Sequence, residues 1–293
     1  MVFYIEADNV GLVFCQDCGD DLYRWFGVDH PYNKIMSLRI LILVPYYNRP
    51  ILLRNAMQSV LRANQFYDKW ELSFGDDGSS IPGRPIVEDV LKDHLERVEF
   101  YKSNMSFEDK LEHGIILGRM ANEAITQSSA DVAITLCDDD ELFPTYLRDL
   151  NLFFENNPSV LYCYSKIHLF NPLKQKSDVV NNVSGKYNQW EGPIDPVNKV
   201  DGCQVAWRLS CCKQHGAWFT DSTKFVSGKP WVKDTDKSFF EVLYNKFGPC
   251  YPTGIFAQYK GIHDYQLLWH KNATSESLRD YDTKVKSLAG VKL

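Results

Sequence analysis

Three consecutive aspartates carry the clearest chemical signal in this 293-residue chain. They are Asp138, Asp139 and Asp140, and the run before them, residues 131–137, is mostly apolar, so a buried strand is expected to end in negative charge. Neighbouring carboxylates raise one another's pKa unless a cation lies among them, and Mg²⁺ and Mn²⁺ are the usual partners of oxygen ligands. The triplet therefore indicates a divalent-cation site. The structural alternative is an acidic approach to a helix that opens at Pro144.

The elements that would position this triplet alternate along the chain. Strands are predicted at residues 40–44, 70–74, 98–101, 131–137 and 160–170. Helices are predicted at residues 50–64, 86–97, 108–127, 144–156 and 236–247. This alternation predicts an α/β chain with a mostly parallel, Rossmann-like sheet and helices on both faces. Ligands of such sheets bind outside the carboxyl ends of the strands, where the triplet would lie.

The pattern is not even along the chain. Residues 1–36 show no clear period and are expected to form an N-terminal extension. Residues 37–275 would form the main domain, with regular alternation in residues 37–140. Residues 141–275 read as less regular, which suits a surface that receives a variable second substrate. Residues 276–293 would be a C-terminal tail.

Composition excludes several classes of protein. The chain has 32 basic and 38 acidic residues, so a grip on nucleic acid backbone is disfavoured. It has no run of about 18 apolar residues and no basic segment before an apolar start, so neither a membrane span nor secretion is expected. Its 8 cysteines are scattered, which favours a reducing compartment. We expect a cytoplasmic protein, with peripheral membrane association as the alternative.

Five short motifs follow one another in an order that a known family shows. They are LILVPYYNRP at 41–50, FGDDGSS at 74–80, Gly118 and Arg119 with Asn122, CDDDELFP at 137–144, and a late aspartate before a helix followed by WHKNATSES at 269–277. Together they resemble the family 2 glycosyltransferases, which have the GT-A fold, over roughly residues 38–275. The resemblance implies a metal-dependent, inverting hexosyl- or pentosyltransferase. It would move a sugar from a nucleotide-diphosphate donor to an acceptor hydroxyl.

The resemblance assigns the nucleotide to the first two motifs. Pro45, Tyr47 and Asn48 would pass close to the base of a UDP-, GDP- or dTDP-sugar. Asp76 and Asp77 would accept hydrogen bonds from the base or the ribose. The structural alternatives are an ordinary strand exit and a simple Asp-Gly turn.

The resemblance assigns the metal to the aspartate triplet. Asp138 and Asp139 align with the family's metal motif, with Asp139 as the first choice of Mn²⁺ or Mg²⁺ ligand and Asp140 as its neighbour. The donor diphosphate would bind at the same place, with Asp138 beside it. The family often has an aspartate where this chain has Cys137, which puts in doubt how many protein carboxylates touch the metal.

Two further residues would serve the metal or the diphosphate. Arg119 would pair with a carboxylate of the motif or with phosphate, since its planar guanidinium suits both. The alternative for Arg119 is a solvated helix residue. His270 would supply a metal ligand or hold phosphate, with His263 as its competitor.

The acceptor hydroxyl must lose a proton, and in inverting members of the family a late carboxylate takes it. Asp234 resembles that residue, and Asp236 is its rival. The family usually has an acidic residue where this chain has Lys233, and Asp221 is a further candidate. The structural alternative is a cap for the following helix.

The acceptor would be a glycan, a lipid-linked molecule or a protein, with nucleic acid less favoured by the charge. One alternative function is a nucleotidyltransferase, although that class normally needs a glycine-rich, basic loop after the first strand. The other is a catalytically inactive module that binds a nucleotide-sugar, which the departures at Cys137 and Lys233 would favour.

Overall fold

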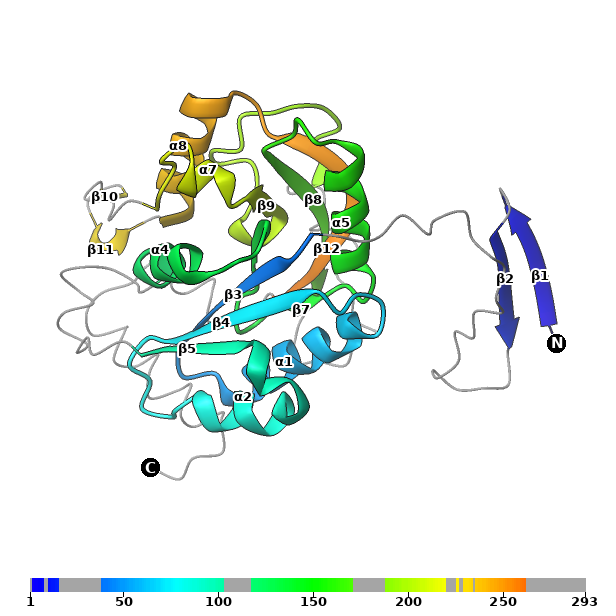
Figure 1. Cartoon of the computed structure of the whole chain (residues 1–293), viewed down its shortest axis with the longest axis horizontal. Coiled ribbons are helices and arrows are strands. Elements are labelled where there is room, and N and C mark those ends of the chain that lie inside the picture. Colours follow the sequence, from blue (N-terminus) through cyan, green and yellow to red (C-terminus); the bar gives the residue numbers. More distant parts are fainter. Residues whose placement is uncertain are drawn as a thin grey trace. The chain divides into compact units, whose positions relative to one another are not determined.

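The chain forms two compact units in the computed structural model, Met1–Ile35 and Met36–Leu293 (Figure 1). The structure describes residues 2–7, 10–15, 38–102, 117–170, 188–219, 225–226, 229–233 and 235–261.

The first unit contains a β-hairpin that the sequence pattern does not predict. Strand β1 (Val2–Ala7) pairs antiparallel with β2 (Val10–Cys15), from Val2 opposite Cys15 to Ala7 opposite Val10. Apolar residues do not alternate with polar ones in either strand, so the period of 2 that marks a half-buried strand is missing.

We expect the second unit to fold without the first. A chain that starts at Met36 should stay soluble and unfold cooperatively, because the second unit has hydrophobic clusters of its own. Circular dichroism melts of the full and shortened chains would test this. Aggregation of the shortened chain, or loss of its cooperative transition, would show that the N-terminal residues belong to the core.

The second unit is built on an eight-stranded sheet with the order β5-β4-β3-β6-β9-β8-β12-β7. Its strands are β3 (Ile40–Tyr46), β4 (Trp70–Asp76), β5 (Val98–Lys102), β6 (Val132–Thr135), β7 (Glu141–Leu142), β8 (Tyr162–Phe170), β9 (Val205–Arg208) and β12 (Tyr251–Gly261). Strands β5, β4, β3 and β6 are parallel neighbours, as are β8 and β12, whereas β9 and β7 run antiparallel to their neighbours. A separate two-stranded sheet pairs β10 (Phe225–Val226) with β11 (Lys229–Lys233). The prediction of a mostly parallel sheet is confirmed.

Helices cover both faces of the sheet, as predicted (Figure 1). They are α1 (Pro50–Asn64), α2 (Arg84–Val90), α4 (Leu117–Gln127), α5 (Tyr146–Asn156), α7 (Ser210–Lys213) and α8 (Thr235–Phe247), with 3₁₀ turns η1 (Lys92–Arg97) and η2 (Gly202–Gln204). Successive side chains of a strand point to opposite faces, so Ile40 and Ile42 pack in the cluster that holds α1 and α5. Leu41 and Leu43 pack in the cluster that holds α4 and α8.

One glycine allows α4 to lie close on the sheet. A Cβ at Gly75 of β4 would lie 2.1 Å from Met120 Sδ of α4. That side chain fills the space left by the missing Cβ, which brings the start of α4 onto the strand that leads into the FGDDGSS motif.

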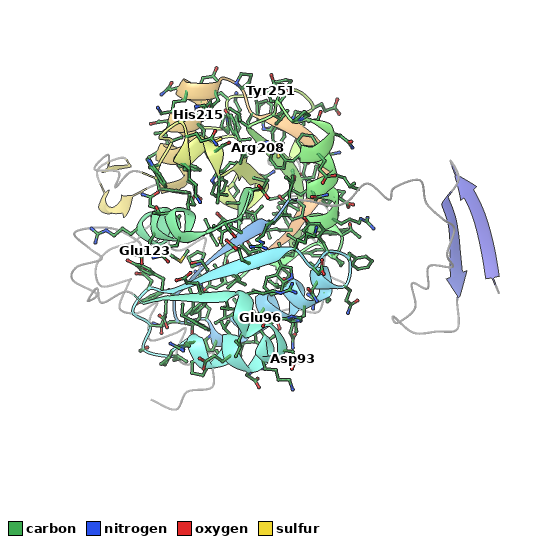
Figure 2. The ribbon with its side chains drawn as sticks, in the orientation of Figure 1. Asp93, Glu96, Glu123, Arg208, His215 and Tyr251 are labelled. Carbon is green, nitrogen blue, oxygen red and sulfur yellow. The ribbon has the colours of Figure 1, made fainter. Side chains whose placement is uncertain are left out.

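The C-terminal half is more regular than its sequence pattern indicates. Strands β7, β8, β9 and β12 all follow residue 140, and β9 lies between β6 and β8 in the middle of the sheet. Arg208 of β9, labelled in Figure 2, donates to the carbonyl oxygens of Val160 (3.0 Å) and Phe154 (2.8 Å). These hydrogen bonds tie the sheet to the end of α5. The helix predicted at 86–97 is instead α2 followed by η1, with a non-helical residue at His94. Among the described helices, none is both long enough and apolar enough to cross a membrane.

Candidate active site

Three neighbouring strands end at the same edge of the sheet. Strand β3 lies between β4 and β6 and runs parallel to both, so their carboxyl ends meet. The segments that follow them are the turn at 47–49, the turn at 77–80 and the aspartate triplet at 138–140. The strand pairing therefore brings these three segments to one edge of the sheet, and the triplet follows a strand end, as predicted.

Asn48 joins the first turn to the second. Its backbone N–H donates to Ser79 Oγ (3.0 Å), and its Oδ1 accepts from Ser80 Oγ (3.0 Å) and from the N–H of Ile81 (3.1 Å). It has a positive φ of 53°, a conformation that asparagine tolerates better than most residues. Asn48 is only 1% exposed, so its buried side chain holds the two turns together beneath the surface of the site.

The two aspartates of the second turn have different surroundings. Asp76 accepts from the N–H groups of Ser79 (2.8 Å) and Gly83 (3.0 Å), so both of its carboxylate oxygens hold the turn. Gly78 supplies the positive φ of 68° that this turn needs. Asp77 is buried, and its N–H donates to the carbonyl of Tyr46 (3.0 Å). The structural alternative therefore accounts well for Asp76, and Asp77 is the better candidate for a nucleotide contact.

A cation does lie among the aspartates of the triplet, and it belongs to the chain. Arg49 Nη1 is 2.9 Å from Asp138 Oδ1 and 2.9 Å from Asp139 Oδ2. Asp138 Oδ2 also accepts from the N–H of Tyr47 (3.0 Å), which ties the triplet to the first turn. The sequence motifs do not identify Arg49 as a partner of the triplet, because it lies 89 residues from Asp138.

Asp140 connects the triplet to the end of β12. Its Oδ1 accepts from the N–H of Gly261 (2.8 Å), whereas its Oδ2 is buried with no hydrogen-bond partner among the described residues. Beside it, Lys260 Nζ lies 2.9 Å from Asp201 Oδ1, an ion pair that the sequence did not suggest. Burial raises the pKa of Asp140 to about 8, although the charge of Lys260 opposes that rise.

Among the described residues, this cluster holds more carboxyl groups than cationic side chains. The carboxyl groups are those of Asp138, Asp139, Asp140 and Asp201, and the cationic side chains are Arg49 and Lys260. Burial likewise raises the pKa of Asp138 to about 6. A divalent cation bound among these carboxyl groups would favour their charged form.

The donor set also fits such a cation. One ligand atom each of Cys137, Asp139 and Asp140 lies within 4.8 Å of the other two. Burial raises the pKa of Cys137 well above its ordinary value, so this residue is a thiol and a poor ligand for Mg²⁺ or Mn²⁺. The oxygens of Asp139 and Asp140 remain, and Asp140 Oδ2 is a buried acceptor that a cation would satisfy.

Asp236 lies against the backbone next to this cluster. It is in the first turn of α8, and a Cβ built on Gly202 would lie 2.4 Å from Asp236 Oδ2. Gly202 follows Asp201, the partner of Lys260, in the sequence. A series of contacts and chain neighbours thus runs from the triplet to Asp236, and a Cβ at 202 would require the Asp236 carboxylate to shift.

Arg119 is exposed on α4, and its pairing with the triplet or with phosphate stays a prediction. Other predicted site residues, namely Asp234 and His270 together with the rivals Asp221 and His263, lie outside the described residues.

Asn122, singled out with Arg119 in the third motif, has a structural contact. Its side chain donates to the carbonyl of Phe219 (2.8 Å) and accepts from the N–H of the same residue (3.0 Å). This pair of bonds holds the segment after α7 on α4.

Comparison with solved structures identifies the fold to which this architecture belongs. TarS 1-349 of S. aureus in complex with UDP-GlcNAc matches with a TM-score of 0.59 and 14% identity, over 85% of this chain and 66% of that one. The mannosyltransferase PcManGT of Pyrobaculum calidifontis, in complex with GDP-Man and Mn²⁺, matches with a TM-score of 0.53 and 11% identity, over 85% of this chain and 69% of that one. A second structure of TarS 1-349 matches with a TM-score of 0.56 and 16% identity, over 76% of this chain and 60% of that one. The chain has the GT-A glycosyltransferase fold.

The family follows from the sequence. The model described as "Glycosyl transferase family 2" matches residues 41–192, just over half of the 293 residues. The chain belongs to glycosyl transferase family 2. No curated protein matches it in sequence. The chain spans 60% of the length of TarS 1-349 in one of these structures.

Proposed function

We propose that this protein is a metal-dependent, inverting glycosyltransferase, which moves a sugar from a nucleotide-diphosphate donor to an acceptor hydroxyl. The observation that carries the proposal is the unbalanced acidic cluster at the joined ends of β3, β4 and β6, in a chain of this family. Three strand ends meeting at one edge form the place where open α/β sheets bind nucleotides.

The donor's nucleotide would lie over the first two turns. Tyr47 is half-buried beside Asp138, so its ring is a candidate surface for the base. Asp77 would accept a hydrogen bond from the base or the ribose. The two turns beneath the nucleotide would be held in place by the strand pairing of Pro45 and by the hydrogen bonds of Asn48 and Asp76.

The diphosphate would lie at the triplet. Asp139 and Asp140 would hold Mn²⁺ or Mg²⁺, with His270 as a further proposed ligand, and Asp138 would stay bound to the first turn. A cation bound there would neutralise charge on the departing diphosphate. TarS 1-349 was solved in complex with UDP-GlcNAc, and PcManGT was solved in complex with GDP-Man and Mn²⁺. These complexes support the same class of donor and cation here. The donor's base and sugar stay open among UDP-, GDP- and dTDP-sugars.

A carboxylate at the start of α8 would remove the acceptor's proton. Asp234 is the residue that the resemblance favours, but the contact with Gly202 supports Asp236, which we propose as the base. A base on the acceptor side and a diphosphate leaving from the other side give a single displacement. The product anomer would therefore be inverted relative to the donor.

Gly202→Ala should separate positioning of this base from donor binding. The added methyl group would lie too close to Asp236 Oδ2 and displace the carboxylate, so we expect kcat to fall about tenfold or more with little change in donor Kd. Gly192→Ala is the matched control, because a Cβ there meets nothing within 4 Å. Steady-state kinetics and thermal melts of both variants would test this, and equal kinetics for the two would remove the proposed role of Asp236.

Donor hydrolysis tests the function as a whole. The protein incubated with each nucleotide-sugar and Mn²⁺ should gain thermal stability by mass action and slowly release nucleoside diphosphate, and a chelator should stop the release. Stabilisation without release would favour the inactive binding module. Release of pyrophosphate from a nucleoside triphosphate and a sugar phosphate would favour the nucleotidyltransferase.

The proposals for the acceptor and for the cellular compartment rest on the amino-acid composition of the chain. A net charge of −6 favours a glycan, lipid-linked or protein acceptor over nucleic acid. The six cysteines whose side chains the structure describes are all free thiols, which supports a cytoplasmic location.

A further inference from the structure

Arg49 occupies the position between two carboxylates where a cation would be needed. The same nitrogen, Nη1, lies 2.9 Å from an oxygen of Asp138 and 2.9 Å from an oxygen of Asp139. The two carboxylates are 6% and 3% exposed, so the pair is well shielded from water, whereas Arg49 is 22% exposed and reaches in from the rim.

The backbone of Arg49 is fixed on both sides. Before it, Asn48 is buried and bound to the second turn, and after it Pro50 opens α1. The carbonyl of Arg49 accepts the N–H of Leu53 (2.9 Å), the first hydrogen bond of that helix. Any movement of the charge must therefore be a rotation of the side chain alone.

A divalent cation at Asp139 would compete with this guanidinium. A cation bound to Asp139 Oδ2 would draw on the same lone pairs that now accept from Arg49 Nη1. The two positive charges would also repel each other in a buried place, where screening is weak. Asp138 is held by the N–H of Tyr47 on its other oxygen and would stay bound to the first turn, so it can keep Arg49 as a partner.

We infer that Arg49 is a resident counter-charge that must leave Asp139 before a divalent cation binds there, and that the donor's diphosphate draws it away. The guanidinium suits phosphate as well as carboxylate, so the arriving anion offers it a new partner. The inference rests on the proposed function and adds to it an order in which the cation and the diphosphate bind. The cation should bind weakly to the protein alone and tightly together with a nucleoside diphosphate.

The test measures Mn²⁺ binding to the whole protein without any sugar donor. Wild type, Arg49→Gln and the control Arg54→Gln are titrated with Mn²⁺, with free ion followed by electron paramagnetic resonance. Arg54 lies on the same helix, but its ion pair with Asp89 is exposed on both sides. We expect Arg49→Gln to bind Mn²⁺ alone about tenfold or more tightly than wild type, and Arg54→Gln to match wild type.

Thermal melts provide a second readout. In chelator, Arg49→Gln should melt below wild type, because Asp138 and Asp139 lose the charge that compensates them. Added Mn²⁺ should raise its melting temperature more than it raises that of wild type. If Arg49→Gln does not fold, Arg49→Lys keeps a charge but loses the planar fork, and it should show the same tightening at smaller size.

The outcomes separate this inference from the proposed function. UDP and GDP, each added with Mn²⁺, should tighten Mn²⁺ binding strongly for wild type and less for Arg49→Gln. If wild type binds Mn²⁺ with a nucleoside diphosphate but Arg49→Gln binds Mn²⁺ alone no better than wild type, only the counter-charge role is overturned. If none of the proteins binds Mn²⁺ under any of these conditions, metal dependence is overturned and the role of Arg49 with it.

Discussion

Asp139→Ala should abolish turnover while the protein stays folded. We expect kcat to fall on the order of 10³-fold, since a bound metal ion contributes several kcal/mol of charge stabilisation at the leaving group. Binding of nucleoside diphosphate in the presence of Mn²⁺ should weaken as well. The fold should survive because Asp138 still pairs with Arg49, and the removal of one buried carboxylate reduces repulsion in the cluster.

Initial rates of nucleotide-sugar consumption, with calorimetric titration of UDP or GDP, measure this effect. Asp89→Ala is the matched control, since Asp89 is an exposed carboxylate on α2 whose ion pair has no link to the site. Full activity of wild type in chelator, or of Asp139→Ala in Mn²⁺, would contradict metal-dependent catalysis at this residue.

Asp236→Asn should remove proton abstraction and spare the donor. Asparagine keeps the shape of the side chain but cannot accept a proton, so we expect a loss on the order of 10²-fold or more in kcat at unchanged donor Kd. Asp234→Asn is made beside it and should stay near wild type. The opposite result, with the large loss at Asp234, would return the role to the residue that the resemblance favours.

The stereochemistry of the product provides an independent check. NMR of the first product formed should show an anomeric coupling inverted relative to the donor. Retention of configuration would rule out either aspartate as the base of a direct displacement, even with the family assignment intact.

Local signals explain why the first half of the fold could be predicted closely. Helix α1 is predicted at 50–64 and found at Pro50–Asn64, because Pro50 opens it and buried residues such as Leu53, Met57 and Val60 recur at helical spacing. Strand β3 is a continuous apolar run and β4 alternates apolar with polar residues, and both strands extend two residues further than predicted. The position of the acidic triplet at a strand end could be predicted for the same reason, since it depends only on the strand before it.

The missed parts depend on contacts between distant residues. Strand β12 contains Pro252 and Gly254, residue types that usually interrupt strands, and its pairing with β8 shifts register near them. Arg49 is 89 residues from its partner Asp138, and nothing local marks it as part of a metal motif. Gly202 becomes significant only once α8 packs beside it. Pairings of this kind are set by tertiary structure, which periodicity does not report.

The position of β9 in the sheet decides how this protein can be divided into segments. A strand from residues 205–208 separates β6 from β8, so the sheet of the nucleotide half is completed only by chain made after residue 200. A chimaera joined at residue 140 would exchange β9, the neighbour of both β6 and β8, together with the rest of the chain after the triplet. The proposed acceptor preference, if residues after 140 set it, could therefore not be transferred as a separate module. It would have to be changed residue by residue, in the segments between strands whose alteration leaves the order of the sheet intact.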